Sequence, residues 1–100
     1  MEEQYKKALK RGKELIREVA PIAAKATSFQ TAVDVALDEL KVKLPRELRG
    51  LIGELDVAKW LRDAQLMDER SYYRLKILML KDEISYYEYV LDNLEMEEIE

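Results

Sequence analysis

Residues 71–87, SYYRLKILMLKDEISYY, carry the triplet Ser-Tyr-Tyr twice, fourteen residues or two heptads apart. From this segment to residue 94, apolar residues recur at alternating spacings of four and three, which is typical of a helix that packs one stripe of side chains against other helices. The stripe consists of Tyr73, Ile77, Leu80, Ile84, Tyr87, Leu91 and Leu94. We expect a helix that has Asp68 as its N-cap and runs to about Leu94, and we assign the stripe to the seam of an intramolecular bundle.

A second apolar face lies about 155° around the same predicted helix. It consists of Tyr72, Leu75, Met79, Tyr86 and Tyr89. The far side of a helix in a four-helix bundle normally meets water, and tyrosine and methionine are enriched at protein interfaces. We therefore expect this face to bind a second copy in a homodimer, or another protein. The alternative is that the remaining helices enclose both faces, which needs no partner.

Two further helices are expected before residue 45. The chain holds only three glycines and two prolines, and its apolar spacing is helical throughout. The first helix should begin near Glu3 and kink or end at Pro21, because proline removes a backbone hydrogen bond. The second should follow a capping box in which Thr27 and Gln30 bond to each other's backbone. It should end at Pro45.

A third helix is expected from about Pro45 to Gln65, and Gly50 and Gly53 are the places where it would bend or break. Within it, Trp60 is expected at the edge of the core, although a lone tryptophan could also anchor a partner. The sequence therefore predicts an all-α, up-and-down four-helix bundle whose last helix is the longest. We expect one domain over residues 1–94 and a frayed acidic tail over residues 95–100.

Composition narrows the possible functions. The chain lacks cysteine and histidine, which excludes disulfides, thiol nucleophiles, histidine-dependent catalytic triads and zinc sites built on these residues. We expect no cofactor and no catalysis. No apolar run approaches 18 residues, and the first residues do not resemble a signal peptide, so we expect a cytoplasmic protein that is not inserted in a membrane. The abundance of Lys, Arg and Glu is thermophile-like.

One alternative function is nucleic-acid binding. Lys6, Lys10, Lys13 and Arg17 form a basic row at helical spacing, and such a row could follow a phosphate backbone. The row has no aromatic residue for base stacking, and the net charge of −4 repels polyanions. Rows of this kind are most often solvated faces.

A further alternative is an enzyme. Residues 53–61, GELDVAKWL, resemble the second metal-binding segment of all-α nucleoside triphosphate pyrophosphohydrolases of the MazG type. The resemblance implies that acidic residues on helices bind magnesium. Glu54 and Asp56 are one residue closer together than in that pattern, and the upstream acidic group is only Asp34, Asp38 and Glu39. A non-catalytic protein-protein interaction or assembly module is therefore the function that we expect.

Overall fold

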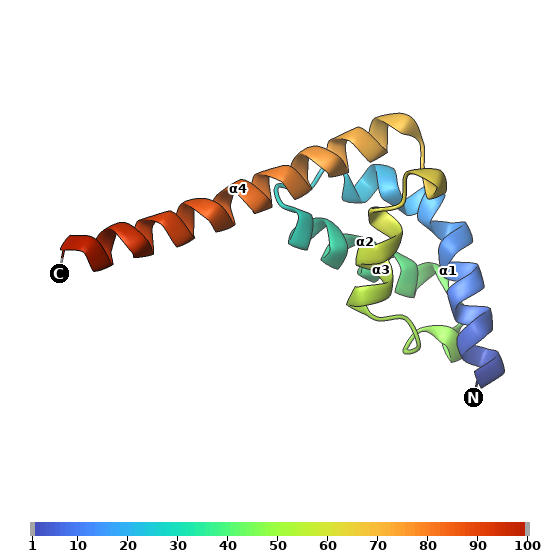
Figure 1. The fold of residues 1–100 in the computed structure, drawn as a ribbon. Coiled ribbons are helices and arrows are strands. Elements are labelled where there is room, and N and C mark those ends of the chain that lie inside the picture. The colour runs from blue at the N-terminus through green and yellow to red at the C-terminus, as the bar shows by residue number, and fades with distance from the viewer. Residues whose placement is uncertain (1, 100) are drawn as a thin grey trace.

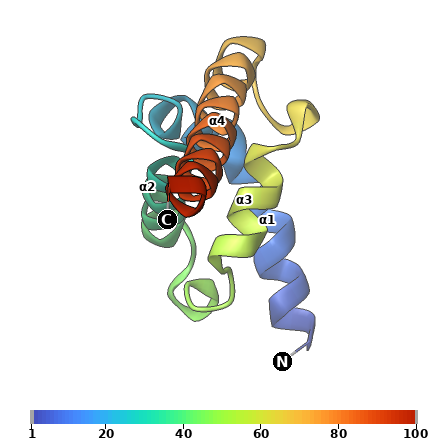
Figure 2. The same ribbon diagram turned by 60° about the vertical axis from the view of Figure 1, so that its left-hand side comes forward.

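The computed structural model describes residues 2–99, and the prediction of an all-α fold is confirmed (Figure 1). Short 3-10 turns, η1 and η2, separate the longer helices. The elements are α1 (Glu2–Ala23), α2 (Phe29–Lys43), η1 (Arg46–Leu48), α3 (Glu54–Leu61), η2 (Ala64–Leu66) and α4 (Glu69–Ile99). Helices α1 to α3 and the beginning of α4 form a body, from which the rest of α4 projects (Figures 1 and 2).

The first two helices follow the predicted pattern with two differences at their ends. Helix α1 contains Pro21 and continues to Ala23, so the proline does not end it. Helix α2 is capped by Ser28, whose hydroxyl oxygen accepts a hydrogen bond from the Thr31 backbone N–H at 3.1 Å. The predicted cap at Thr27 is therefore wrong by one residue, because the chain is extended at Ser28 and Phe29 already belongs to the helix.

The third predicted helix is broken where its glycines lie. Only α3, with 8 residues, remains after η1. Gly53 is extended and precedes α3, and its backbone N–H donates to a carboxylate oxygen of Asp56 at 3.1 Å. This bond satisfies a backbone donor at the helix start, where intrahelical partners are missing. The break makes this part of the body much shorter than a continuous helix would.

The core lies where α1, α2 and α3 meet. Ile16, Leu40 and Leu61 are fully buried there. Trp60 is also buried, inside the core rather than at its predicted edge, and its ring lies against Gly12 of α1. A Cβ atom at position 12 would come within 2.7 Å of Trp60 Cζ3 and Cη2. Glycine is therefore required at this helix crossing for the indole to fit.

Helix α4 has 31 residues, and only its first part packs on the body. Leu75 and Leu78 join the core, whereas from residue 80 to residue 98 every side chain except that of Val90 is exposed. The radius of gyration is 16.6 Å, compared with about 13 Å for a compact domain of this length. The helix continues past its expected end at Leu94 to Ile99; Glu100, the last residue of the predicted frayed tail, lies outside the described residues.

Asp68 caps α4, as predicted from the sequence. Its carboxylate accepts hydrogen bonds from the Ser71 hydroxyl at 2.7 Å and from the Ser71 backbone N–H at 2.9 Å. These bonds favour the ionised carboxylate and lower the pKa of Asp68 from its ordinary value of 3.8. The bond from the Ser71 hydroxyl has the largest effect. The cap determines where α4 begins, at the point where the helix meets the body.

Replacing this cap should have a pH-dependent effect. Because the folded-state pKa of Asp68 is lowered, its stabilisation is fully present above 3.8 and is lost as the pH falls through the folded-state value. We expect Asp68→Ala to lower the urea midpoint of unfolding at neutral pH, and the difference from the wild type to shrink in acid. Urea titrations of both proteins at two pH values check this; a difference that is equal at both would contradict it.

Candidate association surface

The stripe assigned to the intramolecular seam faces solvent. Tyr73 is 56% exposed, Ile84 is 55% exposed and Leu94 is 52% exposed, and the other members of the stripe are exposed as well. The assignment to an internal seam is therefore wrong. Helix α4 rests on the body through the opposite side of its first turns, which carries Ser71, Leu75 and Leu78. The 4-3 stripe is thus left without a partner among residues 2–99.

The face predicted to bind a partner is divided between two environments. Leu75 is completely buried, and Tyr72 and Met79 are half-buried against the core, so these three residues serve the chain's own packing. This corrects the prediction that they are free for a partner. Tyr86 and Tyr89 continue the same face beyond most of the body and are exposed. The sequence correctly indicates two apolar faces on α4. In the first turns of the helix their environments are the reverse of the prediction, because the face expected to bind a partner packs on the body and the face expected to pack on the body is exposed.

The exposed stripe has the geometry of a coiled-coil seam. In heptad positions abcdefg, its 4-3 spacing places Ile77, Ile84 and Leu91 at a. It places Tyr73, Leu80, Tyr87 and Leu94 at d. The stripe extends for about 30 Å at the α-helical rise per residue. Side chains at a and d fit between those of a facing helix as knobs into holes, so the surface suits one long helix.

The positions beside the stripe are mostly charged. Lys76 and Glu83 lie at g on one side, and Arg74, Lys81 and Glu88 lie at e on the other. All of these residues are exposed. Charged residues at e and g determine the orientation and the choice of partner in coiled coils. The surface therefore has an apolar centre and polar margins, as protein interfaces do.

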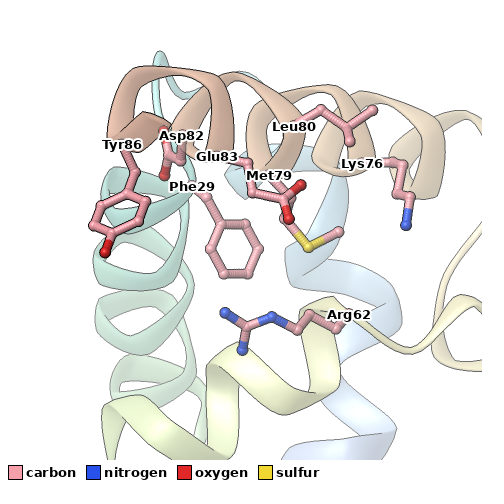
Figure 3. Close-up of a pocket in the computed structure, with 8 residues that line it drawn as sticks. All are labelled: Phe29, Arg62, Lys76, Met79, Leu80, Asp82, Glu83 and Tyr86. Carbon is pink, nitrogen blue, oxygen red and sulfur yellow. The ribbon is translucent and has the colours of Figure 1, made fainter. Parts of the chain in front are cut away.

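A hollow of about 480 Å³ lies under α4 where the helix leaves the body (Figure 3). Phe29 at the start of α2 and Met79 of α4 point into it, and Arg62 lies over the Phe29 ring with its guanidinium carbon 4.8 Å from the ring centroid. Lys76, Asp82 and Glu83 give its wall charges of both signs. This mixture does not select an anion or a cation. Leu80 of the stripe also borders the hollow, so the two features are continuous.

The basic row on α1 faces solvent. Lys6, Lys10, Lys13 and Arg17 are all exposed, and none of them belongs to the core. Acidic residues lie on the same helix: Glu14 accepts from Arg11 at 3.0 Å, and Glu18 is 3.7 Å from Lys43 of α2. Lys13 also borders a shallow hollow with Lys59 and Arg62. Nucleic-acid binding by this row stays a prediction.

The acidic residues considered for magnesium have other contacts. Asp56 accepts from Gly53 at the start of α3, and Asp34 accepts from the Gln30 side chain at 3.3 Å. Over residues 2–99, no three Asp or Glu side chains are grouped closely enough to hold a metal ion. Enzyme activity stays an alternative hypothesis that rests on the short resemblance alone.

The described helices include none with the length and apolarity needed to cross a bilayer. The unpartnered stripe of α4 is the most extensive candidate for a functional surface. No family model, curated protein or solved structure matches the chain.

Proposed function

We propose that this protein is a non-catalytic assembly module that self-associates through the projecting part of α4. The observation that carries the proposal is the exposed stripe of Ile, Leu and Tyr side chains from Tyr73 to Leu94. A contiguous apolar surface of this size on a water-soluble domain is typical of a protein interaction site. Burying the stripe against a facing helix would remove its apolar side chains from water.

The amino-acid composition of the projecting part of α4 also favours a partner. A helix without tertiary packing depends on residues of high helix propensity, because most helical stability in proteins comes from packing. The projecting part of α4 instead contains Ile84, Tyr86, Tyr87, Tyr89 and Val90, whose helix propensities are lower than those of Ala or Leu. Packing against a second helix would supply the tertiary contacts that stabilise most helices in proteins.

A second copy of the chain is the partner that we favour. The three a positions carry Ile or Leu, and two of the four d positions carry Leu, so each helix offers knobs and holes of matching size to another helix of the same sequence. Symmetric dimers are also the commonest assemblies of soluble proteins. The module would therefore join two copies of the body by their long helices.

Sedimentation equilibrium of the intact chain over a series of concentrations tests self-association. We expect twice the monomer mass of 11.8 kDa at high concentration and a fall toward the monomer mass on dilution. Far-UV circular dichroism should lose helical signal as the dimer dissociates, since the projecting helix loses its packing. A monomer mass at every concentration would refute self-association and favour a different protein as the partner.

A further inference from the structure

We infer that the two copies pair antiparallel, with the two-fold axis crossing α4 between residues 85 and 86. The inference rests on the proposed self-association and adds the orientation and register of the partner helix. It is carried by the charges that flank the exposed stripe, because those charges differ between the two halves of the helix.

The flanking charges change sign along α4. In the first half, Arg74 and Lys81 at e and Lys76 at g are basic. In the second half, Glu88 and Glu95 at e and Glu97 at g are acidic. Glu69 and Glu83, at g in the first half, are the exceptions, and Val90 occupies the remaining g position. A helix with one basic half and one acidic half is complementary to a second copy that runs in the opposite direction.

A parallel pair would place like charges together. In a parallel coiled coil, a g residue meets the e residue five positions later on the partner. Lys76 would then face the partner's Lys81, and Glu83 would face the partner's Glu88. Each contact occurs twice by symmetry, so the parallel pair contains four repulsive contacts. Glu69 at g would face the partner's Arg74 at e, and these two attractive contacts offset only part of the repulsion.

An antiparallel pair converts these contacts into attractive ones. In this arrangement a residues face d residues, and e faces e while g faces g. With the axis between residues 85 and 86, Ile77 meets the partner's Leu94 and Ile84 meets the partner's Tyr87. Leu80 meets the partner's Leu91, so the stripe is buried from Ile77 to Leu94, and Tyr73 at its end meets the partner's Glu98.

The same register matches the flanking charges. Arg74 then lies near the partner's Glu95, and Lys81 lies near the partner's Glu88. On the other side, Lys76 lies near the partner's Glu97, while Glu83 faces the apolar Val90 of the partner. Each pair forms twice, which gives six contacts between opposite charges and none between like charges.

The position of the body is compatible with this pairing. In the first turns of α4, Leu75 and Leu78 pack on the body, and they lie on the side of the helix opposite Tyr73 and Ile77. The stripe is therefore open along its full length, including the part that lies over the body. Because α4 projects from one end of each body, the two bodies would lie at opposite ends of the helix pair (Figures 1 and 2).

Charge reversals at positions 81 and 88 distinguish the two orientations. In the antiparallel pair, Lys81→Glu alone or Glu88→Lys alone turns two attractive contacts into repulsive ones, and we expect the dimer Kd to rise about tenfold. An equimolar mixture of the two variants, or the double variant, restores attraction and should recover the wild-type Kd. In a parallel pair each single reversal removes repulsion and should tighten the dimer instead.

The outcomes separate the inference from the proposal on which it rests. A monomeric wild type refutes the self-association, whereas a dimeric wild type that is tightened or unchanged by both single reversals refutes only the antiparallel register. Circular dichroism of each variant checks that the body is folded. Sedimentation equilibrium provides the Kd values at low salt, where contacts between exposed charges are least screened.

Cross-linking gives an independent readout, because the chain has no cysteine of its own. We expect a chain with Ile77→Cys to be cross-linked by a short bis-maleimide to a chain with Leu94→Cys when the two are mixed. Neither variant should be cross-linked efficiently to itself. Efficient self-cross-linking of both variants, with no mixed product, would overturn the antiparallel register.

Discussion

Replacing Trp60 by alanine should lower the free energy of unfolding by about 3–5 kcal/mol, because the substitution removes a buried aromatic ring and leaves a cavity. The indole is 3% exposed, and it fills the space between α3 and Gly12 of α1. Urea unfolding followed by far-UV circular dichroism measures the loss. All variants need the same protein concentration, since association would add to the apparent stability.

Leu55→Ala is the matched control for this substitution. Leu55 lies on the same helix and is 88% exposed, so its truncation should change stability by no more than about 0.5 kcal/mol. A second control uses Gly12→Ala, which should destabilise the wild type by forcing a Cβ atom against the indole. In the Trp60→Ala background the same change should cost less, because the contacts with the indole are gone and only the flexible end of the Ile52 side chain, with Cδ1 2.7 Å from the added Cβ atom, must shift. Equal effects of Gly12→Ala in both backgrounds would contradict the packing described here.

The helices could be predicted from the sequence because their determinants are local. Apolar spacing identified α1, α2 and α4, and Asp68 provided a recognisable cap for α4. The two glycines at positions 50 and 53 correctly indicated where the third segment breaks. The contact of Trp60 with the core followed from its place on the apolar side of α3.

The sequence could not predict which face of α4 packs on the body, because both faces are apolar. How much of α4 is covered depends on the lengths of the other helices. A third helix running from Pro45 to Gln65 would be long enough to cover much of α4. The real α3 has 8 residues and α2 has 15, whereas α4 has 31. At the α-helical rise these lengths are about 12, 22 and 46 Å, so the body covers only the beginning of α4.

The adjacent tyrosines Tyr86 and Tyr87 should respond differently to the same substitution. They are almost equally exposed, at 62% and 63%, and their rings contact each other edge to face. Tyr87 belongs to the exposed stripe at a d position, whereas Tyr86 lies on the other apolar face. Tyr87→Glu would bury two carboxylates in the seam of the dimer. We expect it to weaken association by at least about 3 kcal/mol, more than about a hundredfold in Kd.

Tyr86→Glu is the matched control, since it adds the same charge to the neighbouring residue outside the seam. We expect it to change the free energy of association by about 0.5 kcal/mol or less. The decisive measurement is sedimentation equilibrium of both variants at a concentration where the wild type is dimeric. A monomeric Tyr87→Glu beside a dimeric Tyr86→Glu is the result that the exposed stripe predicts. A dimeric Tyr87→Glu beside a monomeric Tyr86→Glu would contradict it and assign association to the other face of α4.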